Sequence, residues 1–116
     1  MIKRMTLLKR KPGLSREELR KQYEEVHVPL LLNLLPTIRK LVRNYIAPTN
    51  VIPTSTEEPE FDCITEIWFD DMEGYQAMMD AMAGDAGQAI RHSAQVFVDG
   101  ATSVNFLVEE VESDHQ

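Results

Sequence analysis

One amphipathic segment, from Ser15 to Leu35, most constrains how this chain folds. Ser15 and Glu18 form a capping box at its start, and Pro36 ends it. Its apolar side chains recur at spacings of three and four, the period of a helix with one buried face. They are Leu19, Tyr23, Val26, His27, Leu30, Leu31 and Leu34. The segment therefore predicts a long helix that has to pack against another layer.

His27 lies on the apolar face of this helix, and Pro29 follows two residues later. Proline has no backbone N–H, so the carbonyl of Glu25 loses its helical donor and the helix should bend or loosen beside His27. Partial burial would keep the imidazole neutral near pH 7, which suits a general acid or base. The alternative is a structural core histidine whose nitrogens bond to a backbone carbonyl.

Length and composition predict a single soluble domain, which we place at residues 1–111, with a flexible acidic tail at 112–116. The net charge of −7 disfavours nucleic acid and anionic membranes as partners. No apolar run is long enough to span a bilayer, and the N-terminus does not resemble a signal peptide. The lone Cys63 cannot form an internal disulfide, which favours the reducing cytoplasm.

The remaining patterns complete an order of strand, helix, strand, strand, helix, strand. Strands are predicted at residues 2–9, 40–47, 61–69 and 102–111. The second helix should be capped by Asp70 and closed by Gly84, and a short helix from Asp85 to Ala94 should follow, with Gln88 completing a capping box. Between the second and third strands, the polar segment from Thr49 to Glu60 predicts a long loop.

Two strands carry apolar side chains on both faces. In the third strand, Ile64 and Trp68 alternate with a second apolar set, and the first strand shows the same feature. An antiparallel sheet with helices on one side usually leaves its other side polar. The second face should therefore pack against another copy of the chain and make a homodimer.

Several segments together resemble the EthD family of the dimeric α+β barrel superfamily. They are Leu8-Lys9-Arg10-Lys11-Pro12-Gly13-Leu14-Ser15 leading into Glu17-Glu18-Leu19, then His27-Val28-Pro29-Leu30, Val42-Arg43-Asn44-Tyr45, Phe61-Asp62, Glu66-Ile67-Trp68-Phe69-Asp70 and Phe97-Val98-Asp99. The likeness covers roughly residues 2 to 111. It implies an α+β, ferredoxin-like βαββαβ sandwich, in which helices cover one face of a four-stranded antiparallel sheet. The other face would pair two copies into a barrel.

The resemblance also implies a cavity between helices and sheet that takes a small, mostly apolar or phenolic compound. The family is named for a protein linked to ethyl tert-butyl ether degradation, and its superfamily includes cofactor-free monooxygenases, cyclases and isomerases. The implied function is cofactor-independent acid–base or oxidative chemistry centred on His27. Tyr23 and Asn44 would hold a substrate oxygen, and Thr65, Ile67 and Phe69 would line the pocket. The alternative is a non-catalytic dimeric protein that carries or senses such a ligand in the same cavity.

Other candidate residues favour structural interpretations. His92 lies off the apolar stripe of its helix, and His115 is in the tail; no histidine has a partner at metal-ligand spacing, so we expect no metal. No dinucleotide or phosphate motif is present, so we expect no cofactor, and haem on one inward histidine is a weaker option. Cys63 is typical of a small buried hydrophobe. Asp62 and Glu66 share a strand face, where an intersubunit salt bridge or a wet strand edge is favoured over a catalytic pair.

Overall fold

The computed structural model describes residues 1–47 and 59–115 of the chain. Its strands are β1 (Ile2–Leu8), β2 (Lys40–Tyr45), β3 (Cys63–Phe69) and β4 (Val104–Val108). Its helices are α1 (Arg16–Gln22), the π-helical turn η1 (Tyr23–His27), α2 (Val28–Leu34), α3 (Met72–Met82) and α4 (Asp85–Ala94). The predicted elements are all present, with strand ends shorter by up to a few residues. Most of the predicted loop from Thr49 to Glu60 lies outside the described residues.

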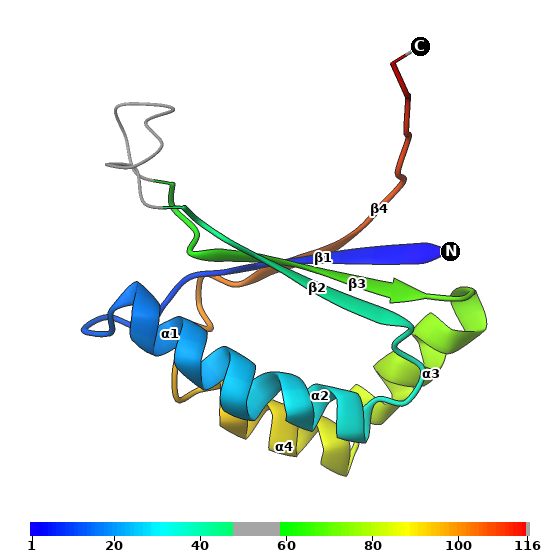
Figure 1. Ribbon diagram of the computed structural model, residues 1–116. Coiled ribbons are helices and arrows are strands. Elements are labelled where there is room, and N and C mark those ends of the chain that lie inside the picture. The colour runs from blue at the N-terminus through cyan, green and yellow to red at the C-terminus, as the bar shows by residue number, and fades with distance from the viewer. Residues whose placement is uncertain (48–58, 116) are drawn as a thin grey trace.

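The four strands form one antiparallel sheet in the order β2-β3-β1-β4. Helices α1 to α4 lie together on one side of this sheet, and no helix of the described chain covers the other side (Figure 1). This order and layering are those of the α+β ferredoxin-like fold. The register places Arg4, Thr6 and Ile67 on the helix-facing side, whereas Met5, Trp68 and their neighbours face outward.

The first helix is interrupted beside His27, as Pro29 predicts. The Val28 N–H bonds to the carbonyl of Tyr23, five residues back, so the turn Tyr23–His27 is π-helical. A π turn holds one extra residue, and this shifts the buried stripe of the residues that follow. Val28 and Leu31 are buried, whereas Val26, which the pattern placed inside, is 46% exposed. The sequence therefore located the interruption correctly but not its effect on the buried face.

Helices α3 and α4 form the other half of the helical layer. The N-cap of α3 is Asp71, whose Oδ1 accepts the Gly74 N–H at 2.9 Å, so the prediction of Asp70 was wrong by one residue. Helix α4 has the predicted bounds but no side-chain cap, and the predicted box with Gln88 does not form. A Cβ at Gly87 would stand 1.8 Å from the Met82 carbonyl oxygen. Glycine at this position therefore lets α4 start directly against the end of α3.

A buried carboxylate fixes the region where β1 leaves the sheet and α1 begins. Asp62 is 5% exposed and accepts hydrogen bonds from the Arg10 backbone N–H at 2.8 Å, Arg10 Nη1 at 2.6 Å and Arg16 Nε at 2.9 Å. Burial alone would raise its pKa, but these donors hold the pKa of Asp62 below its ordinary value. The predicted intersubunit salt bridge or wet strand edge is therefore wrong for Asp62, because its partners lie in the same chain.

The core lies between the helices and the inner face of the sheet. Its largest buried side chains are Phe69, Phe97 and Leu19, with Cys63 at 0% exposure beside them. Phe97, which follows α4, packs edge-to-face against His27 with ring centroids 5.2 Å apart. No helix in the described ranges is long and apolar enough to cross a membrane. The apolar packing thus surrounds the first helix at the turn that carries His27.

Candidate functional site

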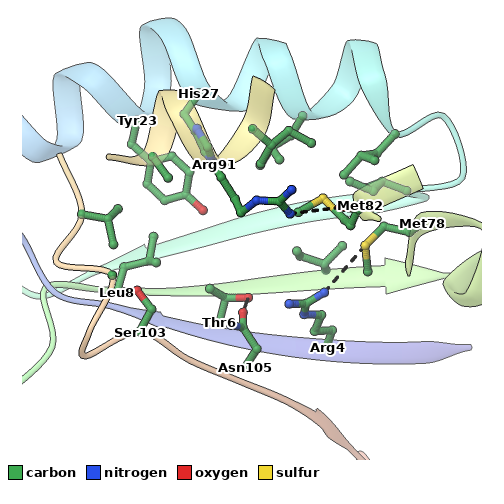
Figure 2. A pocket seen from close by; sticks show the side chains of 18 of the residues that line it. Arg4, Thr6, Leu8, Tyr23, His27, Met78, Met82, Arg91, Ser103 and Asn105 are labelled. Carbon is green, nitrogen blue, oxygen red and sulfur yellow. Dashed lines mark hydrogen bonds between the residues drawn. The ribbon is translucent and has the colours of Figure 1, made fainter. Parts of the chain in front are cut away.

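A cavity of about 480 Å³ lies between the helices and the sheet, next to His27. Its walls are mostly apolar and come from both the sheet and the helices. The apolar lining residues include Leu8 of β1, Ile67 of β3, Leu31 of α2, Met78 and Met82 of α3, and Ile90 of α4. Figure 2 shows Tyr23 and His27 approaching this space from the helices, and Thr6, Arg4 and Asn105 from the sheet. A cavity of this size and character is suited to a small organic ligand.

His27 lies in the wall of this cavity, as the apolar face of the helix predicts. The side chain is 7% exposed, and Nδ1 lies 3.0 Å from the Ser93 hydroxyl of α4. Among the described residues none forms a hydrogen bond with Nε2. Burial lowers the pKa of His27 to about 4, so the ring is neutral at pH 7. The ring therefore has one anchored nitrogen and one that is free for a ligand.

Tyr23 lies one turn before His27 and also lines the cavity. Its hydroxyl lies 2.6 Å from Thr65 Oγ1 on β3, and burial raises its pKa well above the ordinary value. The hydroxyl therefore stays protonated and is already paired inside the protein, not extended into solvent. It remains able to take part in one further hydrogen bond, since a hydroxyl both donates and accepts.

Behind Tyr23, a charged pair links α1 and η1 to the sheet. Arg43 of β2 binds Glu24 through Nε and Nη2 at 2.8 and 2.7 Å, and the Tyr45 hydroxyl donates to the same carboxylate. The two Arg43 hydrogen bonds hold the pKa of Glu24 below its ordinary value. Glu24 therefore positions the π turn and does not act on the cavity, which neither Glu24 nor Arg43 lines.

The sheet contributes polar side chains to the wall of the cavity that lies opposite the helices. Thr6 Oγ1 of β1 donates to Asn105 Oδ1 of β4 at 2.8 Å, and Ser103 lies nearby in the wall. Arg4 of β1 extends its guanidinium beneath the helices, and Arg91 of α4 lines the same space from an exposed position while donating to the Met82 carbonyl at 3.0 Å. No aspartate or glutamate of the described chain lines the cavity.

The predicted site residues separate into three groups. His27, Tyr23 and Ile67 line the cavity. Thr65 and Phe69 face the helices but are 1% and 0% exposed and lie behind the wall, where Thr65 holds Tyr23. Asn44 is on the opposite face of the sheet, where its amide donates to the Ile64 carbonyl and to Glu66. The prediction that Asn44 holds a ligand oxygen in this cavity is therefore not met by its position, because strand alternation turns Asn44 away from the helices.

Sequence reasoning missed Arg4, Ser93, Arg91 and Asn105. One signal was available for Arg4, since it shares a strand face with Ile2 and Leu8, which is unusual for a charged residue inside a small domain. The other three carried no distinguishing pattern, because each depends on how a helix or strand end docks against the first helix. His92, expected at the surface, is exposed.

The other reactive groups do not form a second centre. Cys63 is buried, and desolvation raises the pKa of its thiol to about 11, which is unfavourable for a nucleophile. The described residues contain no group of three or more histidine, cysteine or carboxylate side chains that could hold a metal ion. The chemistry that this arrangement offers is hydrogen bonding and proton transfer at Nε2 of His27, with the Arg4 guanidinium on the facing sheet wall and Arg91 on α4.

Comparison with known proteins agrees with the fold. The model of the EthD domain matches residues 11–101. A solved structure of an ethyl tert-butyl ether degradation (EthD) family protein from Bacillus halodurans is 24% identical, with a TM-score of 0.67, and the match covers 96% of this chain and 100% of that one. No significant match was found among curated proteins.

More distant structures share the fold at lower identity. A dimeric protein of unknown function with a ferredoxin-like fold from Bacteroides fragilis is 12% identical, with a TM-score of 0.61 and coverage of 94% of this chain and 95% of that one. A hydroxynitrile lyase from Passiflora edulis is 11% identical, with a TM-score of 0.62 and coverage of 97% and 96%. At these identities the likeness establishes the fold.

Proposed function

The chain belongs to the EthD domain family. Because it has a mostly apolar cavity beside its first helix, we propose that it acts on a small, mostly apolar compound bound next to His27. The reaction class is cofactor-independent proton transfer on an enolisable or phenolic substrate. One observation carries this proposal: a neutral, buried imidazole is held at Nδ1 by Ser93 while Nε2 is left for a ligand in an apolar cavity.

The geometry supports a simple mechanism. When Nδ1–H donates to Ser93, Nε2 presents its lone pair to the cavity and removes a proton from a carbon next to a substrate carbonyl. The C–H electron pair forms a carbon–carbon double bond as the carbonyl π pair moves to oxygen, which gives an enolate, and the proton is held on Nε2. When the enolate is conjugated with a carbon–carbon double bond of the substrate, return of that proton to the far carbon of the conjugated system shifts the double bond and completes an isomerisation, so no other reactant is needed. The structural neighbour that is a hydroxynitrile lyase gives an example of an enzyme on this fold.

A non-catalytic carrier is the second candidate, and one observation favours it. Tyr23, a second ionisable group in the wall, has its pKa raised by burial and its hydroxyl paired with Thr65, so it is a poor partner for proton exchange near pH 7. A cavity with a single neutral acid–base group can simply hydrogen-bond a ligand. The two candidates use the same cavity and differ only in whether a proton moves.

Deuterium exchange into 2-tetralone in D2O, followed by NMR, distinguishes them. This ketone is small, apolar and readily enolised, and exchange at its α-carbon reports proton removal without requiring the natural substrate. We expect the wild type to accelerate the exchange over buffer, and His27→Gln to lose at least about a hundredfold of that rate, the size of general-base catalysis. Its affinity for the ketone should stay within about tenfold, because glutamine keeps much of the shape and hydrogen bonding.

The matched control is His92→Gln, because His92 is exposed and does not line the cavity. It should exchange at the wild-type rate. Binding of 2-tetralone without accelerated exchange in the wild type supports the carrier instead. Exchange that is equally fast in His27→Gln contradicts catalysis by His27, and failure of the cavity to bind any small ketone or phenol contradicts both candidates.

The same proposal includes a homodimer formed through the outer face of the sheet. Phe106 and Val104 of β4 are 43% and 42% exposed on this face, beside Met5 and Leu7 of β1. No described helix covers this surface, and the neighbour from Bacteroides fragilis is dimeric. Apolar side chains on an uncovered sheet are typical of a face that packs against another subunit.

Sedimentation velocity at micromolar concentration tests the dimer. We expect the wild type to sediment with the mass of two chains and Phe106→Glu to shift it to one chain, since a carboxylate at the interface would be buried without a partner. Glu73→Gln, an exposed change on α3, is the control that should leave the dimer intact. A monomeric wild type contradicts this part of the proposal.

A further inference from the structure

The cavity beside His27 has an unusual charge for this protein. The chain carries a net charge of −7, yet two guanidinium groups, those of Arg4 and Arg91, line the cavity. No carboxylate of the described residues is among the lining groups to balance them. The cavity is therefore a local positive region inside an acidic protein, and its charge cannot follow from the average composition.

Arg4 is the more informative of the two, because its surroundings do not neutralise it. Its Nη1 approaches two thioether sulfurs, Met78 Sδ at 3.7 Å and Met79 Sδ at 3.9 Å, which are weak acceptors without charge. Within the described ranges Arg4 forms no ion pair. A guanidinium normally occupies an enclosed position only when a carboxylate or several strong acceptors receive its five N–H groups.

Three other arginines that pack against the fold have carboxylate partners. Arg10 and Arg16 share the carboxylate of Asp62, and Arg43 forms two hydrogen bonds with Glu24. Arg4 differs from all of these in having its donors directed toward a cavity instead of an acid. Figure 2 shows its guanidinium extending from β1 into the space beneath the helices, on the wall that faces His27.

We propose that the ligand of this cavity is an apolar carboxylate, whose carboxylate group binds Arg4 while its apolar body fills the space toward His27. This inference rests on the proposed function and adds the chemical class of the ligand. A planar guanidinium binds a carboxylate with two parallel hydrogen bonds, so one group both neutralises Arg4 and orients the ligand. The Met78, Leu31 and Ile90 side chains then contact the apolar body.

This arrangement also gives the two walls different tasks. Arg4 acts as a binding residue on the sheet side, and His27 meets the far end of the ligand from the helix side. Arg91 is exposed, so it lies toward solvent and attracts anions to the entrance without being enclosed with them. A neutral compound of the same shape fills the same apolar space but leaves Arg4 without a partner.

Calorimetric titration with 1-naphthoate and 1-naphthamide at pH 7.5 tests the inference, because the two probes share size and shape and differ in charge. We expect the wild type to bind the carboxylate at least about tenfold more tightly, the range of one charge-assisted hydrogen-bonded pair. Arg4→Met should remove this preference by weakening 1-naphthoate, with 1-naphthamide unchanged within about threefold. Adding 1-naphthol, which is neutral at this pH, separates a requirement for carboxylate from a general affinity for aromatic hydroxyls.

Arg39→Met is the matched control, since it removes the same charge from an exposed side chain that does not line the cavity. It should keep the wild-type preference. Equal binding of both naphthalene probes, or a carboxylate preference that survives Arg4→Met, overturns the assignment of Arg4 while leaving the cavity as a binding site. Binding of 1-naphthol that exceeds 1-naphthoate also overturns it. Absence of binding by all three probes contradicts the proposed small-molecule function as well.

Discussion

Lys3 and Arg4 are neighbours in the sequence but lie on opposite faces of the sheet, and their surroundings differ sharply. On the outer face, Lys3 Nζ bonds to Glu66 at 2.5 Å and Glu110 at 2.6 Å, and lies over the Trp68 ring. On the inner face, Arg4 donates to two thioether sulfurs and forms no ion pair with the described residues. Lys3 on the uncovered face is paired with two carboxylates, whereas Arg4 on the enclosed face is paired with no carboxylate of the described residues. An unpaired charge costs more free energy on the enclosed face, because it is desolvated there.

A second comparison points the same way. Asp62, which directly precedes β3, is a buried carboxylate that lies beside the start of α1. It accepts hydrogen bonds from Arg10 and Arg16. The polar groups of the cavity, Arg4 and His27, have donors or acceptors to spare. The carboxylate of Asp62 is therefore satisfied within the chain, whereas among the described residues Arg4 has no carboxylate partner and Nε2 of His27 has no hydrogen bond. We expect the two kinds of group to respond differently to substitution.

The largest effect is expected at Asp62. Replacing Asp62 with alanine removes the carboxylate that accepts the Arg10 N–H and binds two partly enclosed guanidiniums. We expect the free energy of unfolding in urea to fall by about 4 kcal/mol, the cost of breaking a buried ion pair from one side. A loss below about 1 kcal/mol would place Asp62 among ordinary surface pairs and contradict its structural role.

Acid should destabilise the protein through His27. The unfolded imidazole takes up a proton near pH 6.5, whereas the buried ring does so only near pH 4. Between these values the unfolded state binds more protons, so stability falls as the pH drops, by about 3 kcal/mol on reaching pH 4. Urea unfolding at several pH values should show a shallower fall for His27→Gln than for the wild type. Parallel curves would mean that His27 is not desolvated.

Arg4→Met should stabilise the protein, in contrast to Asp62→Ala. Methionine keeps the apolar stem near Met78 and removes a guanidinium that is partly desolvated without a carboxylate. We expect the free energy of unfolding to rise by about 1 kcal/mol, the usual gain when a site optimised for binding is filled with an apolar group. Arg39→Met should show no such gain. A clear loss of stability in Arg4→Met would make Arg4 a structural residue.

The smallest effect is expected at Ser93. Ser93→Ala removes the one hydrogen bond that anchors Nδ1 of His27. Unfolding should become easier by about 1 kcal/mol, the net contribution of a single hydrogen bond. The rate of deuterium exchange into 2-tetralone should also fall, by more than about 1 kcal/mol in activation free energy would explain, because the ring loses its fixed orientation. If the exchange rate is unchanged while the free energy of unfolding falls, the hydrogen bond between Ser93 and His27 stabilises the fold and does not contribute to proton transfer.

The fold could be predicted from the sequence because its signals are local and repeated. The capping box at Ser15, the apolar stripe through Leu19 and Tyr23, and the turn residues between strands each specify an element independently. Pro29 even located the irregular turn. The exact buried face after that turn was not predictable, since one extra residue in a π turn rotates Val28 inward and turns Val26 outward.

The site was predictable only in part. His27 and Tyr23 were found because a polar group on an apolar helical stripe is a local anomaly, and Ile67 was named with Thr65 and Phe69 as the strand face that would line the cavity implied by the family resemblance. Asn44 was misplaced because its strand offered no clear choice of face. Ser93 joins the site through a contact between elements distant in the sequence, which the sequence pattern does not reveal, whereas Arg4 could have been found from its place on the strand face of Ile2 and Leu8.

NMR titration of the His27 ring, with and without 1-naphthoate, tests whether this cavity is the functional site, because it observes the group that is proposed to face the ligand. In the free protein we expect a pKa of about 4. With 1-naphthoate bound, the pKa should fall further, since the carboxylate is held at Arg4 while the apolar body of the ligand packs against the ring and excludes water. A free-protein pKa near the ordinary 6.5 that does not move when 1-naphthoate binds would contradict the claim that this cavity is the functional site.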